Sequence, residues 1–208
     1  MKYIELKNLF GNYITFSLND IKKYQADFDL RRISEWIKKG YIKRIINKHY
    51  YFSDKSFSET EMFFISNKLL EPSYISLESA LSYWGFIPEG VFSITAVSSK
   101  RKIKFETPLS LFTYNKIKPS MFFGYKLIKL AENAIKMAEP EKAIIDFLYL
   151  NPELKSQDDF YELRINKETA EKTLSRTKVK NYLSLIKDKS LNKRVYLLIN
   201  HIFNDHSE

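Results

Sequence analysis

The hydrophobic period of the first 52 residues changes once, at Gly40, and this change restricts the fold more than any other feature of the sequence. Before Gly40, apolar residues recur at intervals of three and four, as they do on the inward face of a helix. After it, the runs 41–46 and 49–52 are rich in β-branched and aromatic residues. Asn47 and Lys48 separate these runs and predict a tight turn, in which Asn47 is expected to adopt a positive φ. The pattern indicates a helix followed directly by a two-stranded ribbon.

The helix before Gly40 has a clear inward stripe and a polar outer face. Leu30, Ile33 and Ile37 are spaced three and four apart and predict the side that packs on a core. Asp27 or Asp29 is expected to cap its first turn. Two lysines and a glycine end it, which is typical of a helix C-terminus.

Two further helices precede this one. Residues 2–10 show helical spacing, and a short helix that runs to about Gln25 begins at a cap supplied by Ser17 or Asn19. Helix, short helix, basic helix and basic ribbon is the order of a winged helix-turn-helix. We therefore predict such a DNA-binding domain over residues 1–56.

The distribution of charge supports this prediction. The chain has 34 basic and 25 acidic residues and a net charge of +9. Residues 1–56 contribute +6, residues 57–150 contribute +1 and residues 151–208 contribute +2. A basic excess clustered in the first quarter of the chain favours nucleic acid or an acidic surface as a partner.

The expected DNA contacts are the outward residues of the third helix and the cations of the ribbon. Arg32 is the candidate for bidentate guanine recognition in the major groove, provided that it faces away from the core. The ribbon residues would contact phosphates or a minor groove. The alternative is that this domain only binds other proteins. The predicted DNA-binding residues are Arg31, Arg32, Ser34, Glu35, Lys38, Lys43, Arg44, Lys48 and His49.

The remaining chain predicts an α+β organisation. Residues 57–208 are expected to form a second domain, in which 57–150 mix helices with a small, mostly antiparallel sheet and 151–208 are helical. Ser58 and Glu61 predict a capping box, and Pro140 predicts a helix start. The predicted strands are residues 91–97, 102–106, 109–114, 121–130 and 133–138. The predicted later helices begin near residues 58, 76, 140, 158, 167, 178 and 191.

Catalytic and metal-binding patterns are absent from the sequence. With no cysteine, thiolate catalysis and Cys-ligated metals are excluded, and the three histidines lack metal-ligand spacing. We predict no enzymatic activity, cofactor or metal. Glu139, Glu141 and Asp146 are the best paired carboxylates, and the structural interpretation is favoured: a helix dipole, with an Asp146–Lys142 pair four residues apart. An enzyme using these three carboxylates is the remaining alternative.

Two other segments have competing interpretations. The basic run Lys100, Arg101, Lys102 and Lys104 predicts a solvated hairpin, with a second anion-binding patch as the alternative. The aromatic stretch 121–125 is interpreted as core rather than as a base-stacking surface. No run approaches the ~18 apolar residues of a membrane span, and no signal peptide is visible, so we expect a cytoplasmic protein without a membrane partner.

A family resemblance is carried by a series of blocks in the middle of the chain. The first block reads Tyr-Ile-Ser-Leu-Glu-Ser-Ala-Leu-Ser-Tyr-Trp-Gly-Phe-Ile-Pro-Glu. In order and spacing, the blocks resemble the abortive-infection AbiEi antitoxin family, which also carries an N-terminal winged helix. The blocks are Tyr74–Glu89, Ile94–Val97, Ser99–Arg101, Phe105–Leu109, Tyr114, Ile117–Pro119, Phe122–Gly124 and Ala138–Asp146.

The resemblance implies a bacterial antitoxin of a type IV toxin–antitoxin system. Such a protein represses its own operon by binding inverted repeats in promoter DNA, and it opposes a nucleotidyltransferase-like toxin without a stable complex. One departure concerns the wing, where similar sequences have Arg-Gly before the residue aligned with Tyr50 and this chain has Asn47-Lys48-His49. A stand-alone regulator or interaction module without a toxin is the alternative.

Overall fold

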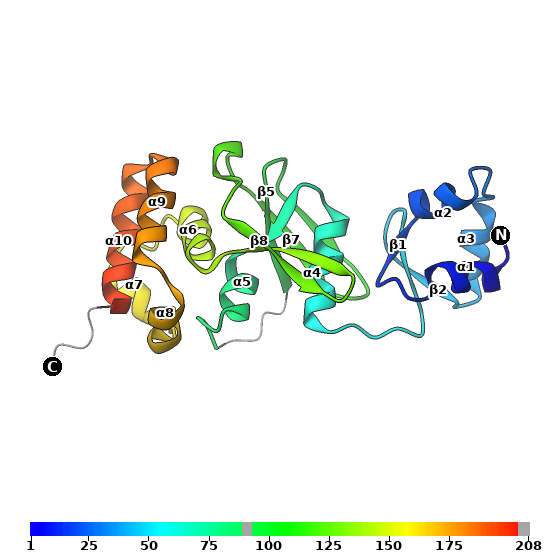
Figure 1. Cartoon of the computed structure of the whole chain (residues 1–208), viewed down its shortest axis with the longest axis horizontal. Helices are drawn as coiled ribbons and strands as arrows, with labels where there is room; N and C mark the ends of the chain where they lie inside the picture. The colour runs from blue at the N-terminus through cyan, green and yellow to red at the C-terminus, as the bar shows by residue number, and fades with distance from the viewer. Residues whose placement is uncertain (89–92, 204–208) are drawn as a thin grey trace.

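The computed structural model describes residues 1–88 and 93–203, which form an elongated molecule with three parts along its length (Figure 1). Within these residues the chain forms ten α-helices and two β-sheets. The fold is therefore mixed α and β, as the sequence predicts. The buried apolar side chains divide into a small cluster, formed within the first 52 residues, and a larger one that spans the rest and also includes Ile14, Ile45 and Tyr51 of the N-terminal unit.

The N-terminal unit contains three helices and a small antiparallel sheet. Its sheet has the strand order β1-β3-β2, so the first short strand pairs with the far strand of the hairpin. Its core is aromatic, with Phe10, Phe16, Phe52 and Trp36 packed together. The elements are α1 (Tyr3–Phe10), β1 (Phe16–Ser17), α2 (Leu18–Tyr24), α3 (Arg31–Lys38), β2 (Ile42–Ile46) and β3 (His49–Phe52).

Local capping determines where α2 begins. The Ser17 hydroxyl accepts a hydrogen bond from the Asp20 backbone N–H at 3.2 Å, and the Asp20 carboxylate accepts one from the Ser17 N–H at 2.9 Å. This reciprocal pair is a capping box. The prediction of Ser17 as the cap is confirmed, whereas Asn19 lies inside the helix.

The predicted inward stripe of α3 is partly wrong. Ile33 is buried, but its inward neighbour is Trp36, and Leu30 is 52% exposed. The helix begins only at Arg31, and the Asp29 carboxylate accepts a hydrogen bond from the Arg31 N–H at 3.0 Å. Because Leu30 precedes the first turn, it does not share the inward face of the helix.

The turn of the hairpin also differs from the prediction. Lys48, and not Asn47, has the positive φ, at 67°. The Lys48 carbonyl accepts a hydrogen bond from the Leu18 N–H at 2.9 Å, which joins the turn to the start of α2. This contact between elements distant in sequence accounts for a backbone conformation that lysine seldom adopts.

The central part is a six-stranded sheet with helices on it. Antiparallel pairs outnumber parallel pairs by three to two, so the sheet is mixed, and larger than predicted. Its strand order is β6-β7-β5-β4-β9-β8. The elements are α4 (Glu59–Leu69), β4 (Ser73–Ile75), α5 (Leu77–Tyr83), β5 (Ser93–Ser98), β6 (Ile103–Glu106), β7 (Leu111–Lys116), β8 (Tyr125–Leu130), β9 (Asn133–Ala138) and α6 (Pro140–Leu150).

Three strand predictions need adjustment. The three-residue strand β4 was not predicted, although it lies in the middle of the sheet. The strand predicted over residues 121–130 begins only at Tyr125, because Pro119–Met121 form a 3-10 turn. Residues 91 and 92 of the strand predicted over 91–97 lie outside the described residues.

Four helices form the C-terminal part, as predicted. Of these, α9 and α10 pack on α6, on its side away from the sheet, and α7 and α8 pack on α10 (Figure 1). No helix in the described ranges is long and apolar enough to cross a bilayer. The helices are α7 (Gln157–Glu162), α8 (Lys167–Thr173), α9 (Arg176–Ile186) and α10 (Lys189–Phe203).

Candidate nucleic-acid interface

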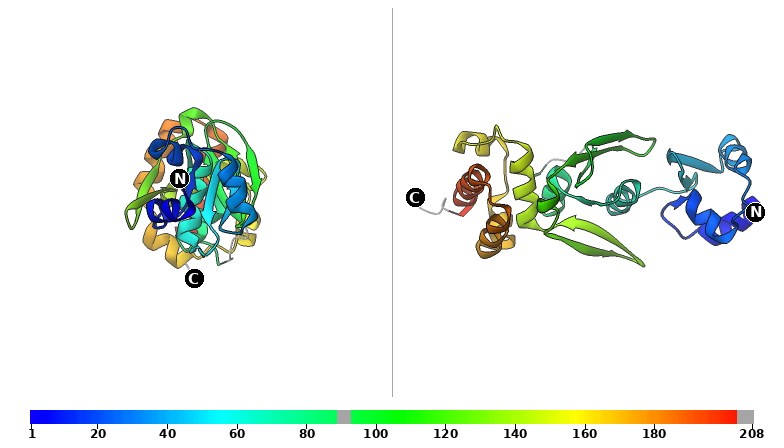
Figure 2. Two further views of the ribbon diagram at one scale, coloured as in Figure 1. Left: turned by 90° about the vertical axis from the view of Figure 1, so that its right-hand side faces the viewer. Right: turned by 90° about the horizontal axis from the view of Figure 1, so that it is seen from above.

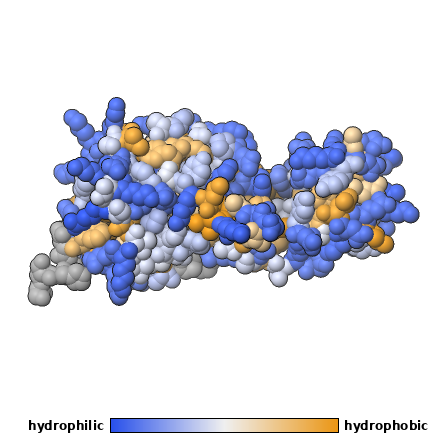
Figure 3. Space-filling view, in the orientation of Figure 1, coloured by the Kyte–Doolittle hydropathy of each residue, from blue (hydrophilic) through white to orange (hydrophobic). Residues whose placement is uncertain are grey.

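The outer face of α3 presents the residues that the sequence singles out. Because Ile33 and Trp36 pack inward, the opposite side of this two-turn helix faces solvent. Arg31, Arg32 and Lys38 are exposed there. Ser34 is also exposed and Glu35 is half-buried. The helix lies at the end of the N-terminal unit that points away from the central six-stranded sheet (Figure 1). Hydrophilic side chains cover most of the visible face of this unit (Figure 3).

Ion pairs occupy much of this face. Glu35 receives hydrogen bonds from Arg32 at 3.1 Å and from Lys39 at 2.7 Å. Arg31 pairs with Asp29 at 3.1 Å. Hydrogen bonds from Lys39 and then from Arg32 lower the pKa of Glu35, and hydrogen bonds from Arg31 lower the pKa of Asp29. Both carboxylates are therefore ionised at neutral pH, and Arg32 must leave Glu35 before it can contact a base.

The hairpin presents cations that are not neutralised in this way. Lys43, Arg44 and Lys48 are exposed, and none has an ion-pair partner within the described residues. An irregular register in β2 turns Ile42 and Ile45 inward, although they are three residues apart. These buried isoleucines leave the two cations between them pointing into solvent, where phosphates could approach.

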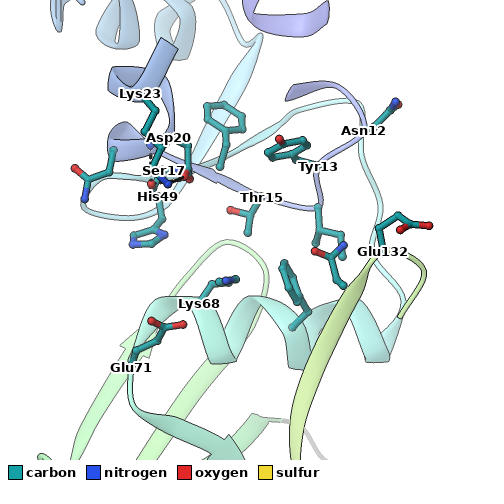
Figure 4. Close-up of a pocket in the computed structure, with 15 residues that line it drawn as sticks. Asn12, Tyr13, Thr15, Ser17, Asp20, Lys23, His49, Lys68, Glu71 and Glu132 are labelled. Atoms are coloured by element: carbon teal, nitrogen blue, oxygen red, sulfur yellow. Dashed lines mark hydrogen bonds and ion pairs between the residues drawn. The ribbon is translucent and has the colours of Figure 1, made fainter. Parts of the chain in front are cut away.

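His49 lies on a different side from these cations. It is half-buried and lines a crevice of about 720 Å³ between the N-terminal unit and α4, to which α4 contributes Lys68 and the segment after α4 contributes Glu71 (Figure 4). Burial lowers the pKa of His49, against a weaker opposing effect of Asp20. The imidazole is therefore neutral at pH 7, and it faces the crevice rather than the exposed side of the hairpin.

A second basic surface lies at one end of the central sheet. The parallel pairing of β5 with β7 places Ser98 beside Lys116, so the loop after β5 and the end of β7 are neighbours. The predicted basic run therefore joins cations that sequence reasoning did not connect with it. The exposed cations of this end are Lys100, Arg101, Lys102, Lys104, Lys116 and Lys118.

The net charge counted over residues 57–150 does not reveal this second surface. Residues 99–138 carry nine basic and two acidic side chains, whereas residues 57–150 together carry only +1. A count over a window of 40 residues would have found it. The two hairpins that contain these residues, β6–β7 and β8–β9, diverge on either side of α4 (Figure 2).

The Lys142–Asp146 pair lies in a fully buried polar cluster. The Asp146 carboxylate accepts hydrogen bonds from the Tyr74 hydroxyl at 2.8 Å and from the Ser76 hydroxyl at 2.9 Å. Lys142 donates to Asp146 and, at 2.8 Å, to Tyr74. All four side chains have no exposed surface. Burial lowers the pKa of Lys142 and raises that of Tyr74. A substrate cannot reach these groups from solvent, which supports the structural interpretation of the pair.

The other two carboxylates connect α6 to α9. Glu139 accepts hydrogen bonds from Lys178 at 2.6 Å and from the Tyr182 hydroxyl. Glu141 accepts one from the Ser175 N–H at 2.9 Å, at the start of α9. Among the described residues, no group of three histidine, aspartate or glutamate side chains could hold a metal ion.

The aromatic stretch 121–125 packs against the core. Met121 is buried, and Phe122 and Tyr125 lie against the ring of Tyr74, with centroids 5.1 and 5.0 Å away. These residues form a loop and the start of β8 rather than one strand.

No protein-family model matches the chain, and no curated protein matches its sequence. The blocks that carry the resemblance can nevertheless be followed in the structure. Tyr74 and Ser76 come from the first block, Lys142 and Asp146 from the last, and the four meet in the buried cluster. Residues 68 to 72 positions apart, from two of these blocks, thus share one buried cluster.

Proposed function

We propose that residues 1–56 form a winged helix-turn-helix that binds operator double-stranded DNA, and that the chain is an antitoxin that represses its own operon. The observation that carries the DNA-binding half is the exposed cationic face of α3 beside the unpaired cations of the hairpin. The element order α1-β1-α2-α3-β2-β3 supports it, because it places a hairpin directly after an exposed helix.

In this proposal α3 enters the major groove. Arg32 exchanges the carboxylate of Glu35 for the O6 and N7 acceptors of a guanine, which suit a planar guanidinium. Lys43, Arg44 and Lys48 contact phosphates and fix the orientation without reading sequence. The second basic surface extends the electrostatic contact beyond the N-terminal unit.

The antitoxin half rests on the family resemblance. It assigns to the second domain an action against a nucleotidyltransferase-like toxin without a stable complex. The buried clusters support a division of labour, since most apolar side chains of the N-terminal unit pack in their own cluster. Repression and antitoxin activity are then separable by substitutions on α3.

A protein-interaction module without DNA binding is the second candidate. The ion pairs of Glu35 with Arg32 and Lys39 favour it, because one carboxylate already engages two cations of the helix face. Such a module would not need to break these pairs to function.

Fluorescence anisotropy with labelled DNA from upstream of the gene distinguishes the two. We expect the full chain to bind this DNA more tightly than a scrambled duplex, with affinity that falls steeply as salt rises. The double variant Arg31→Ala/Arg32→Ala should lose this preference. The control is Lys180→Ala, an exposed lysine of α9 that should leave binding unchanged. Unchanged operator affinity in the double variant would exclude the groove contact.

The toxin half has its own test. Co-expression with a nucleotidyltransferase-like toxin from the same operon should permit growth with the wild-type chain and equally with the Arg31→Ala/Arg32→Ala variant. Growth arrest with the wild-type chain and with the variant alike would refute the antitoxin assignment and leave a stand-alone regulator.

A further inference from the structure

A second pocket, of about 170 Å³, lies where the C-terminal helices meet the central part. Its most deeply buried lining residues are Leu81 of α5, Ile144 of α6 and Leu198 of α10, each at most 4% exposed. Half-buried apolar side chains, including Phe147 and Ile165, complete the walls. The pocket is therefore an apolar cavity formed by segments more than 100 residues apart in sequence.

Among the nine described residues that line this pocket, two carboxylates are the only charged groups. Glu78 of α5 is half-buried, and Glu162 at the end of α7 is exposed. Neither side chain has a hydrogen bond or an ion pair within the described part of the chain. Both carboxylates are hydrogen-bond acceptors that lie beside an apolar surface and have no donor from the described part of the protein.

The sign of this charge is opposite to that of the whole protein. The chain carries nine more basic than acidic residues, yet no basic residue is found among those that the structure describes around the pocket. An apolar cavity with a few polar groups in its lining is the usual form of a small-molecule site. The carboxylates select a cationic group, and the apolar residues select the body of the ligand.

We propose that this pocket binds a small hydrophobic ammonium compound. Its alkyl or aryl body lies against Leu81, Ile144 and Leu198, and its ammonium group donates hydrogen bonds to Glu78 and Glu162. Because the lining residues come from both α5–α6 and α7–α10, an occupied pocket also holds the C-terminal helices on the central part. The inference is independent of the proposed DNA and toxin functions.

The test is an NMR titration of the full chain with labelled isoleucine methyl groups, using hexylammonium, hexan-1-ol and hexanoate as probes. All three share one apolar body and differ in charge. We expect hexylammonium to shift the Ile144 and Ile165 signals and to bind about tenfold more tightly than hexan-1-ol, which follows from a charge-assisted hydrogen bond. Hexanoate should bind most weakly. Hexylammonium should also raise the melting temperature in a concentration-dependent way.

Two variants assign the charge preference to its residues. Glu78→Gln should reduce hexylammonium affinity about tenfold while leaving hexan-1-ol affinity unchanged, and the second value reports that the pocket is intact. Glu162→Gln should have a smaller effect because Glu162 is exposed. Glu106→Gln, an exposed carboxylate on β6, is the control and should change nothing.

Three results would overturn the proposal. One is equal affinity of the wild-type chain for hexylammonium and hexan-1-ol. Another is an unchanged preference for hexylammonium in both Glu78→Gln and Glu162→Gln. The third is no shift of the two isoleucine signals with any probe at millimolar concentration.

Discussion

The N-terminal unit and the central part of the chain differ in where their ion pairs lie. In the first unit, charged side chains lie on the surface in pairs such as Arg32–Glu35, over a core that is wholly apolar and aromatic. In the central part, Lys142 and Asp146 lie inside the core, paired with each other and with two hydroxyls as their only other described hydrogen-bond partners. Exposed pairs contribute little to stability and can exchange partners, whereas a buried pair is fixed by its surroundings.

Because of this difference, the exposed charges can bind a partner, whereas the buried charges connect elements of the fold. In the sequence, Asp146 stands four residues after Lys142, which suggests only an intrahelical pair, yet it connects α6 to β4 and to the start of α5. The charges of α3 connect only residues within six positions of one another. The buried cluster of Asp146 leaves no polar group available to a partner, whereas the exposed charges of α3 leave many.

The largest expected effect is that of breaking the buried pair. Asp146→Ala leaves the Lys142 ammonium buried without its counterion and should lower the free energy of unfolding by about 3–5 kcal/mol. Chemical denaturation followed by the fluorescence of Trp84 measures this loss. The double variant Lys142→Met/Asp146→Leu should be less destabilised than Asp146→Ala.

The chain provides a matched control for this experiment. Glu168 and Lys172 have the same four-residue spacing, but their side chains are 80% and 72% exposed. Glu168→Ala should cause no measurable change in stability. Equal effects of Glu168→Ala and Asp146→Ala would show that burial does not distinguish the two pairs.

A substitution that creates a cavity in the small cluster tests whether the two cores unfold independently. Phe10 is fully buried in the small cluster, so Phe10→Ala should cost about 3–5 kcal/mol in the N-terminal unit alone. The two tryptophans report the two regions separately, with Trp36 in the small cluster and Trp84 packed against the large one. As denaturant is added, fluorine NMR with labelled tryptophan should show unfolding first at Trp36, while the Trp84 signal stays that of the folded protein. Simultaneous loss of both signals would mean that the regions unfold as one.

Base contacts and phosphate contacts should differ in their dependence on DNA sequence. Arg32→Ala should weaken operator binding by about 1–3 kcal/mol and relax specificity, whereas Lys48→Ala should weaken binding to all sequences alike. Competition anisotropy against single-substitution operators measures both. An Arg32→Ala protein with unchanged specificity would remove this residue from the base-reading set.

The smallest effect concerns the carboxylate that joins α6 to α9. Although burial opposes it, hydrogen bonds from Lys178 and Tyr182 lower the pKa of Glu139 below its ordinary 4.5. Its contribution to stability is therefore complete above pH 4.5 and is lost as the pH falls through the folded-state value. Glu139→Gln should lose on the order of 1 kcal/mol near neutral pH and should show a flatter acid dependence.

Denaturation of both proteins between pH 3 and 7 provides the comparison, with Glu153→Gln as an exposed control. An unchanged acid slope in Glu139→Gln would mean that other carboxylates cause the acid sensitivity.

Helix starts and ends were the most predictable part of this fold. Ser17, Ser58 and Pro140 each mark a helix start, because a side chain or a ring satisfies the needs of the first turn within four residues. The outward set of α3 was also predictable, since helical period decides which positions share a face. Trp36, three residues after Ile33, lies on the inward face by the same period, although the predicted stripe did not include it.

The sequence by itself determined the local elements, the basic character of the N-terminal unit and the absence of cysteine chemistry. Only the tertiary structure decided that three residues, Ser73–Ile75, form a strand in the middle of the sheet, because their pairing partners lie 20 to 60 residues away. It alone brought Tyr74 and Ser76 to Asp146, and it joined the loop after β5 to the end of β7. Local patterns act over a few residues through backbone geometry, whereas burial and charge pairing depend on distances that only the folded chain defines.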